Sequence, residues 1–152
     1  MSSNQTQAST PEQSARPAGK PAGPGGPRRI PTPRVLPEAM PFWEAAKDGR
    51  LLVKRCRDCG ETHFYPRDIC PHCMSANTEW VDSNGLGSIY SFSTMGKEEA
   101  RYTLAYVTLD EGVTMLTNLV DCDPAALSIN QRVKVTFKPS EGGYPVPMFA
   151  PV

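Results

Sequence analysis

Two pairs of cysteines are the residues of this sequence best suited to chemistry. Cys56 and Cys59 form one CxxC pair, Cys70 and Cys73 form a second, and ten residues lie between the pairs. Each CxxC turn brings two sulfurs within reach of one ion, and a hairpin between the pairs would complete a tetrahedral site. The spacing predicts one metal ion held by four thiolates. Zinc is the favoured ion, although a mononuclear iron site would use the same ligands.

A metal with four cysteine ligands has no open position for water or substrate, so we expect a structural zinc ion. His63 and His72 are the two histidines of the sequence, and both lie inside the predicted ribbon. Replacement of one cysteine ligand by either histidine is the alternative that this count leaves open. Gly60 follows the first pair, where a tight turn is expected, whereas Met74 takes the matching place after the second.

Cys122 is the cysteine outside the two pairs, and Asp121 and Asp123 flank it. Negative neighbours disfavour the thiolate, and no histidine outside the ribbon is available as a base. We therefore expect an inert thiol and no catalytic residue. An acyl-transfer enzyme that uses Cys122 is the competing hypothesis, and full activity of Cys122→Ala would remove it.

Charge is distributed unevenly along the 152 residues. Residues 1–34 carry a net charge of +4 and the remainder −4, which becomes about −6 with a zinc ion held by four thiolates. An acidic folded part weighs against nucleic acid as a partner. No stretch approaches the roughly 18 apolar residues that cross a bilayer, and the first thirty residues contain no run like a signal peptide. We expect a cytoplasmic protein with no membrane contact.

Three regions follow from composition and periodicity. Residues 1–34 contain seven prolines and four glycines and are predicted to form a disordered basic tail. Residues 35–80 are predicted to hold a helix and the zinc ribbon. Residues 81–152 show five short strands with one helical turn between the third and fourth, which indicates a small barrel of the OB type. The predicted fold class is therefore mainly β.

The predicted helix begins near Pro41 and ends at Gly49. It carries much aromatic surface for its length, with Phe42 and Trp43 near its start and Ala46 one turn later. Two interpretations stay open at this point. These side chains either pack on the chain's own core, or they dock into a partner, since buried tryptophans are common interface anchors. Phe42, Trp43 and Ala46 are thus the candidate partner-binding residues.

Two features of the predicted barrel suggest an alternative function and the position of the last strand in the sheet. Tyr90 and Phe92 are expected on one face of a strand, where they could stack on bases. A single-stranded nucleic-acid-binding module is therefore the alternative function. The last strand, near Met148 and Phe149, is interrupted by prolines and is expected at an edge of the sheet.

Short motifs occur in order over about residues 37–150 and end at Pro151. They are Pro41-Phe42-Trp43, Gly49-Arg50-Leu51, Cys56-x-x-Cys59-Gly60, Phe64-Tyr65-Pro66-Arg67, Cys70-Pro71-x-Cys73, Trp80, Gly85-x-Gly87-x-Ile89-Tyr90-Ser91, Ala105-Tyr106-Val107, Leu109-Asp110-Glu111-Gly112, Leu127-Ser128-Ile129, Val133 and Phe149-Ala150-Pro151. With this order, the chain resembles the acyl-CoA-associated proteins that join a rubredoxin-like zinc ribbon to an OB-fold.

The resemblance implies a non-catalytic accessory subunit. Its partner would be a larger thiolase-like subunit, or in other members a hydratase-like or aldolase-like one, and that partner would carry the chemistry. The helix and ribbon would dock on the larger subunit, and the barrel could help to hold a CoA thioester.

Overall fold

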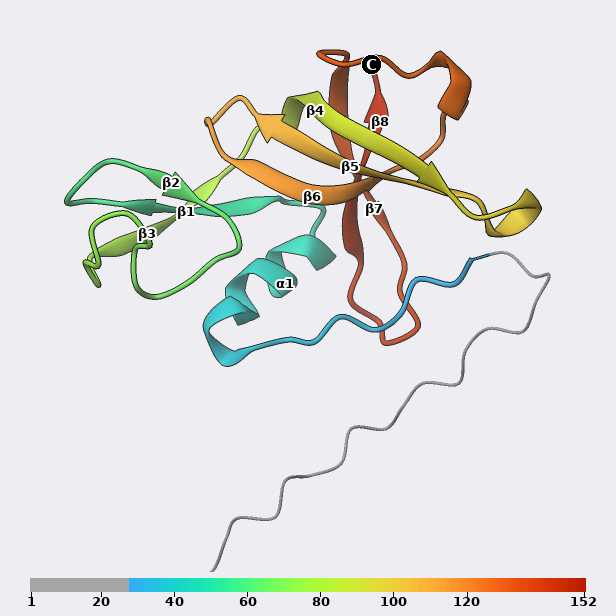
Figure 1. Ribbon diagram of the computed structural model, residues 1–152. Coiled ribbons are helices and arrows are strands. Elements are labelled where there is room, and N and C mark those ends of the chain that lie inside the picture. Colours follow the sequence, from blue (N-terminus) through green and yellow to red (C-terminus); the bar gives the residue numbers. More distant parts are fainter. Residues whose placement is uncertain (1–27) are drawn as a thin grey trace, which may run out of the picture.

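The computed structural model describes residues 28–152, which form one α-helix, a three-stranded sheet and a closed five-stranded barrel (Figure 1). A disordered tail is predicted for residues 1–34. Residues 1–27 of this tail lie outside the described residues. Residues 28–34 run beside the loop that joins β7 to β8. There the carbonyl oxygen of Ile30 accepts a hydrogen bond of 3.0 Å from the backbone N–H of Glu141.

Helix α1 spans Met40–Lys47 and follows the 3₁₀ helix η1 at Pro37–Ala39. The strands are β1 Leu52–Cys56, β2 Thr62–His63, β3 Thr78–Asp82, β4 Leu86–Met95, β5 Tyr102–Leu109, β6 Thr114–Leu119, β7 Arg132–Lys138 and β8 Val146–Pro151. Two further 3₁₀ helices are η2 at Glu98–Ala100 and η3 at Pro124–Ala126. Every helix within residues 28–152 falls short of a membrane span.

The smaller sheet has the order β2-β1-β3, so β1 is paired on both sides. Leu52 and Val53 of β1 are buried, as expected for a central strand, and Cys56 ends the strand in the metal centre. β3 then leads directly toward β4. This sheet therefore carries the first cysteine and connects the ribbon to the barrel.

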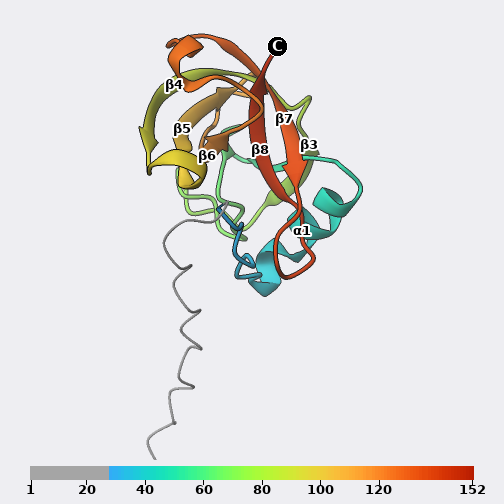
Figure 2. The same cartoon turned by 90° about the vertical axis from the view of Figure 1, so that its right-hand side faces the viewer.

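The barrel has the order β4-β5-β6-β8-β7, and β7 pairs back with β4 to close it (Figure 2). Alternate side chains of β5, from Thr103 to Leu109, are buried inside it. Val133 and Phe149 are fully buried from the opposite wall. The helical turn η3 lies between the third and fourth barrel strands, as predicted. The predicted mainly β fold class, with a ribbon followed by an OB-type barrel, is confirmed.

Strand β8 was expected at an edge, and this prediction is wrong. β8 lies between β6 and β7, and closure of the barrel removes the edge. Its contact with β6 is parallel and short, with the single register pair Leu119 and Phe149. Pro147 pairs with Phe137 of β7, and its carbonyl accepts a hydrogen bond from Thr117. The prolines are tolerated because few ladder hydrogen bonds are required on the β6 side.

Tyr90 and Phe92 do not share a face, contrary to the sequence-based expectation. A bulge lies between Ile89 and Ser91 on β4, where the register with β5 shifts by one residue. Tyr90 is the extra residue and is 68% exposed. Phe92 pairs with the buried Ala105 and packs against the core. A bulge reverses the face of every later side chain, so period-two alternation could not predict this arrangement.

Helix α1 is held by aromatic side chains from both neighbouring parts of the molecule. Phe42 lies 5.6 Å from the ring of Phe64, and the indole N–H of Trp43 donates a 2.9 Å hydrogen bond to the Tyr65 hydroxyl. From the β7–β8 loop, the Tyr144 ring lies 6.1 Å from that of Trp43. We call Phe42, Trp43, Phe64, Tyr65 and Tyr144 the aromatic cluster. It joins the helix, the ribbon and the barrel.

Packing within and around the aromatic cluster determines how far the candidate docking residues are exposed. Phe42 and Ala46 are 1% exposed and Trp43 is 6% exposed, so all three pack on the chain's own core. In this conformation they present little side-chain surface, which favours packing on the chain's own core over direct docking by these residues. Docking by the helix itself stays a proposal, and its exposed side, with Met40 and Glu44, is the part that could make contact.

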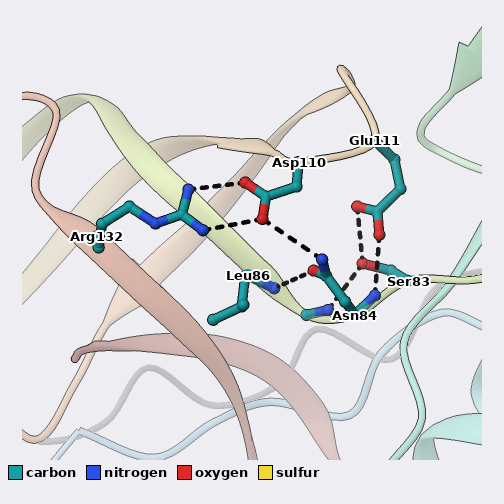
Figure 3. A network of polar contacts seen from close by, with 7 residues as sticks. Ser83, Asn84, Leu86, Asp110, Glu111 and Arg132 are labelled. Atoms are coloured by element: carbon teal, nitrogen blue, oxygen red, sulfur yellow. Dashed lines mark hydrogen bonds and ion pairs between the residues drawn. The ribbon is translucent and has the colours of Figure 1, made fainter.

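A polar network fixes the connection from the ribbon into the barrel (Figure 3). The Glu111 carboxylate accepts hydrogen bonds from the Ser83 hydroxyl at 3.0 Å and from the Asn84 backbone N–H at 2.9 Å. Next to it, Arg132 donates two hydrogen bonds of 2.7 and 2.9 Å to Asp110. The Arg132 guanidinium lowers the pKa of Asp110. The β5–β6 turn is thereby tied both to the linker before β4 and to β7.

Candidate metal centre

Two similar backbone turns position the four cysteines. In the first, the N–H of Gly60 donates to the carbonyl of Cys56 at 3.0 Å, and in the second the N–H of Met74 donates to the carbonyl of Cys70 at 3.0 Å. The residue directly after each CxxC pair adopts a positive φ, +79° at Gly60 and +64° at Met74. The two knuckles therefore have the same geometry, although only the first has the glycine that suits it.

The four sulfurs gather at one point. Their Sγ atoms all lie within 4.8 Å of one another, with 3.6 Å between Cys56 and Cys73 and 3.7 Å between Cys59 and Cys70. Cys56 and Cys70 are buried, whereas Cys59 and Cys73 are exposed. Such an arrangement fits the tetrahedral four-thiolate site of a structural zinc ion. The predicted cofactor, one structural zinc, is thus confirmed, and these four cysteines are the residues that would hold it.

The acid–base properties of the cluster also favour a bound cation. The backbone N–H of Cys59 is the main cause that lowers the pKa of Cys56, to about 7. At Cys73, a hydrogen bond from the Ser75 backbone lowers the pKa, but the neighbouring sulfurs and burial outweigh it and raise the pKa to about 12. Four thiolates this close cannot all ionise unless a positive ion balances them. A dication supplies that balance.

Side chains around the knuckles hold the two loops together. Asp58, inside the first CxxC pair, accepts hydrogen bonds from the Ser75 hydroxyl and, at 2.7 Å, from the Asn77 side-chain amide. The Ser75 hydroxyl is the main cause that lowers the pKa of Asp58. This carboxylate therefore joins the first knuckle to the segment just after the second. This role cannot be read from the sequence, because a single aspartate between two cysteines carries no local signal.

Lys54 is a second residue that sequence reasoning missed. It is only 5% exposed, and its ammonium lies 4.5 Å from the centre of the Trp80 ring. It donates to the Thr78 hydroxyl at 3.2 Å and lies 3.7 Å from the Asp68 carboxylate. Cation–π and charge contacts offset the cost of burying this lysine. Lys54 thus packs the loop before Cys70 onto β3.

Neither histidine belongs to the sulfur cluster found within the described residues. His72 is exposed. His63 is 3% exposed, its Nε2 lies 3.4 Å from the Arg67 carbonyl oxygen, and its Nδ1 has no partner among the described residues. Burial is the main cause that lowers the pKa of His63. The histidines therefore leave the four-cysteine ligand set unchanged.

Cys122 lies apart from the metal centre, after β6. Burial is the main cause that raises its pKa, and the charges of Asp121 and Asp123 raise it further. A thiol in this setting stays protonated near neutral pH and is a poor nucleophile. The geometry supports the expectation of an inert residue.

Comparison with known proteins places this ribbon and barrel in one family. Two family models match adjacent segments: the ChsH2 rubredoxin-like zinc ribbon domain matches residues 43–79, and the ChsH2 C-terminal OB-fold domain matches residues 80–138. A DUF35 domain-containing scaffold protein of Methanocaldococcus jannaschii is 30% identical over 104 residues, which cover 63% of this chain and 74% of the relative. The chain belongs to the ChsH2 (DUF35) family.

Other relatives are named as enzyme subunits. A probable enoyl-CoA hydratase alpha subunit of Thermomonospora curvata is 34% identical over 72% of this chain, and the match spans 36% of that longer relative. The benzoylsuccinyl-CoA thiolase subunit BbsA of Thauera aromatica is 30% identical over 61% of this chain and 69% of the relative. Among solved structures, a chain of the Ltp2-ChsH2(DUF35) aldolase superposes with a TM-score of 0.70 and 30% identity, covering 79% of this chain and 98% of that one.

Proposed function

We propose that this chain is a non-catalytic accessory subunit of an acyl-CoA-processing complex. A thiolase-like subunit is the first candidate partner, and a hydratase-like or aldolase-like subunit is the other. The observation that carries the proposal is the similarity to relatives named as a scaffold, a thiolase subunit and a hydratase alpha subunit, together with the superposition on a chain of an aldolase. The chemistry would belong to the partner, whose stability this chain would support.

The composition of the site supports a role without catalysis. The metal centre has four sulfur ligands, so zinc there has no open coordination position. Burial raises the pKa of Cys122, which disfavours its thiolate, and both histidines lie in the ribbon rather than beside this cysteine. Among residues 28–152, no hydrogen bond joins a cysteine, serine or threonine side chain to a histidine, the pair that most often supplies a nucleophile and its base.

An exposed patch on the outside of the barrel is the candidate contact surface for the partner. Tyr90, Tyr106 and Leu116 are 68%, 47% and 55% exposed. Tyr106 and Leu116 are register partners on β5 and β6, and Tyr90 lies at the β4 bulge, directly before the register partner of Tyr106. Adjacent exposed apolar side chains mark interaction sites, and tyrosine is a frequent anchor. We infer that these three residues, the barrel patch, contact the larger subunit, while the barrel helps to hold the CoA thioester.

Copurification tests the proposal. A tagged full-length chain is expressed in its native host, and the associated proteins are identified by mass spectrometry. A thiolase-like, hydratase-like or aldolase-like subunit is expected in stoichiometric amount. Recovery of the chain without such a subunit would overturn the proposal.

A pair of variants tests the barrel patch in the same experiment. Leu116→Asp places a charge in the patch and is expected to lower partner recovery at least about tenfold, since burying an unpaired charge at an interface is costly. Thr114→Asp is the matched control, because Thr114 is also exposed and lies two residues earlier on the same strand. Equal recovery with both variants would exclude the barrel patch as the contact surface.

Binding of the CoA thioester is tested on the purified complex. Saturable binding of an acyl-CoA is expected to be stronger in the complex than in the larger subunit alone. Equal binding by the two would remove this part of the proposal and leave the accessory role to be judged by copurification.

A further inference from the structure

A second site lies at the opposite end of the barrel strands from the polar network, and the proposed function does not use it. A cavity of about 780 Å³ opens between residues 28–30, the start of β5, the end of β6 and the β7–β8 loop. Small-molecule sites commonly fall between about 300 and 1,000 Å³. Together with Met148 of β8, these parts make five separate segments of the chain, so the cavity is formed by the tertiary fold rather than by one loop.

The floor of this cavity is apolar. Leu119 and Met148 line it and are each 5% exposed, and Ile30 and Val120 complete the apolar part. Ile30 is held in place by the hydrogen bond from the Glu141 N–H to its carbonyl oxygen. A ligand seated here would therefore bury an apolar body against preformed walls.

The rim of the cavity is basic, although the folded part of the chain is acidic. Arg28, Arg29, Arg101 and Lys138 line it together with two carboxylates, those of Asp121 and Glu141. Lys138 pairs with Asp121 at 2.6 Å and Arg29 with Glu141 at 3.4 Å, which balances two of the four cations. Within residues 28–152, Arg28 and Arg101 form no salt bridge.

The two remaining guanidiniums suit an anionic head group. The Arg28 guanidinium carbon lies 3.7 Å from the centre of the Tyr102 ring, which fixes one face of the group and leaves its edge N–H donors available. Arg101 is the residue directly before Tyr102 and is exposed. A guanidinium presents a planar fork of donors that matches carboxylate and phosphate oxygens.

We propose that this cavity binds a small amphipathic anion, with an apolar body on the floor and a carboxylate or phosphate head group between Arg28 and Arg101. The site belongs to this chain alone, and it goes beyond the proposed function because it needs no partner subunit. Copurification tests the proposed function and ligand binding by the chain alone tests this cavity, so either experiment can fail without the other.

Calorimetric titration of the zinc-loaded full-length chain tests the proposal. Decanoate and decyl phosphate are the two anionic probes, and decanol is the neutral probe with the same body. At least one anion is expected to bind with a dissociation constant below ~1 mM and at least about tenfold more tightly than decanol. Comparison of the two anions tells which head group the site prefers. Equal binding of decanol, or no binding of either anion, would overturn the proposal.

Arg101→Gln locates the binding. Loss of a charge-assisted hydrogen bond is expected to weaken the bound anion about tenfold. Arg55→Gln is the matched control, since Arg55 is an exposed residue of β1 outside the cavity lining. Both positions are exposed, so the variants should fold, and thermal unfolding verifies this. Equal affinities of the two variants would show that the anion binds elsewhere.

Cys122 supplies an independent readout, because it lines the cavity and is the cysteine outside the metal centre. In the zinc-loaded chain, modification of Cys122 by a maleimide is expected to slow at least about threefold when the anion occupies the cavity, since a bound ligand covers lining atoms. An unchanged rate at saturating anion would contradict binding at this site.

Discussion

Met74 carries a conformational cost that can be removed. It has a φ of +64° at the position where the first knuckle has Gly60, and it is 74% exposed, so its side chain adds little packing. A left-handed conformation costs a residue with a Cβ about 1–2 kcal/mol, whereas glycine adopts it freely but loses more entropy on folding. We expect Met74→Gly to stabilise the zinc-loaded chain by about 0.5–1 kcal/mol.

Denaturant unfolding of the zinc-loaded variants measures this change. Met74→Ala is the control, because it removes the same side chain and keeps the Cβ, and it should leave stability within about 0.5 kcal/mol. A glycine variant less stable than the alanine variant would contradict the argument.

His63 makes stability depend on pH. Burial lowers its pKa below the ordinary value of 6.5, so the unfolded chain binds this proton more readily than the folded chain. The resulting stability is present above about pH 6.5 and is lost as the pH falls through the lowered pKa of the folded state. We expect His63→Phe to show a smaller drop in unfolding free energy between pH 7.5 and 5.5 than the parent chain.

His72→Gln separates this effect from acid-driven changes at the metal centre. His72 is exposed, unlike the buried His63, so its replacement should leave the drop unchanged. The same drop in unfolding free energy for the parent chain, His63→Phe and His72→Gln would show that His63 does not cause the pH dependence.

At the scale of elements, the aromatic cluster holds helix α1. Phe42 is 1% exposed and contacts the rings of Trp43, Phe64 and Tyr65. Phe42→Ala is expected to cost about 3–5 kcal/mol, since it leaves a cavity where three elements meet. Tyr65→Phe should cost about 1–2 kcal/mol, because it leaves the Trp43 N–H without its acceptor.

Unfolding free energies from denaturant titration measure both effects. Met40→Ala on the exposed side of the same helix is the control, with an expected change within about 0.5 kcal/mol. A loss at Phe42 no larger than at Met40 would show that the cluster does not anchor the helix.

At the scale of the whole molecule, zinc and the barrel stabilise different parts. The knuckles are organised around four sulfurs, whereas the barrel closes around buried side chains such as Val107, Val133 and Phe149. Structural zinc contributes on the order of 10–16 kcal/mol in comparable peptides. Removal of zinc by a chelator is therefore expected to abolish amide-exchange protection in β1 and β2 while β5 and β7 remain protected.

Hydrogen exchange read by mass spectrometry compares the zinc-loaded and chelated chains. Cys70→Ser should behave like the chelated chain and lose most of its zinc. Cys122→Ser should retain one zinc per chain, since this residue is outside the cluster. Loss of protection throughout the barrel on chelation would mean that the two parts fold as one unit.

Local sequence relations determined the metal centre and the order of the elements. Each CxxC pair forms its turn within four residues, and a turn of this kind has few ways to place two sulfurs, so spacing alone predicted the zinc site. The alternating strands, the turn at Glu111 and Gly112 and the helical turn after Asp123 likewise depend on neighbouring residues. These features predicted the ribbon followed by an OB-type barrel.

Tertiary contacts decided the rest. The bond from Trp43 to Tyr65 joins residues 22 positions apart, and that from Tyr144 to Glu44 joins residues 100 apart, so no local pattern could tell an internal aromatic helix from a docking one. The bulge that exposes Tyr90, the closure that encloses β8 and the basic cavity at Arg101 also arise only when distant segments meet. Burial and charge at such places depend on neighbours that sequence order does not reveal.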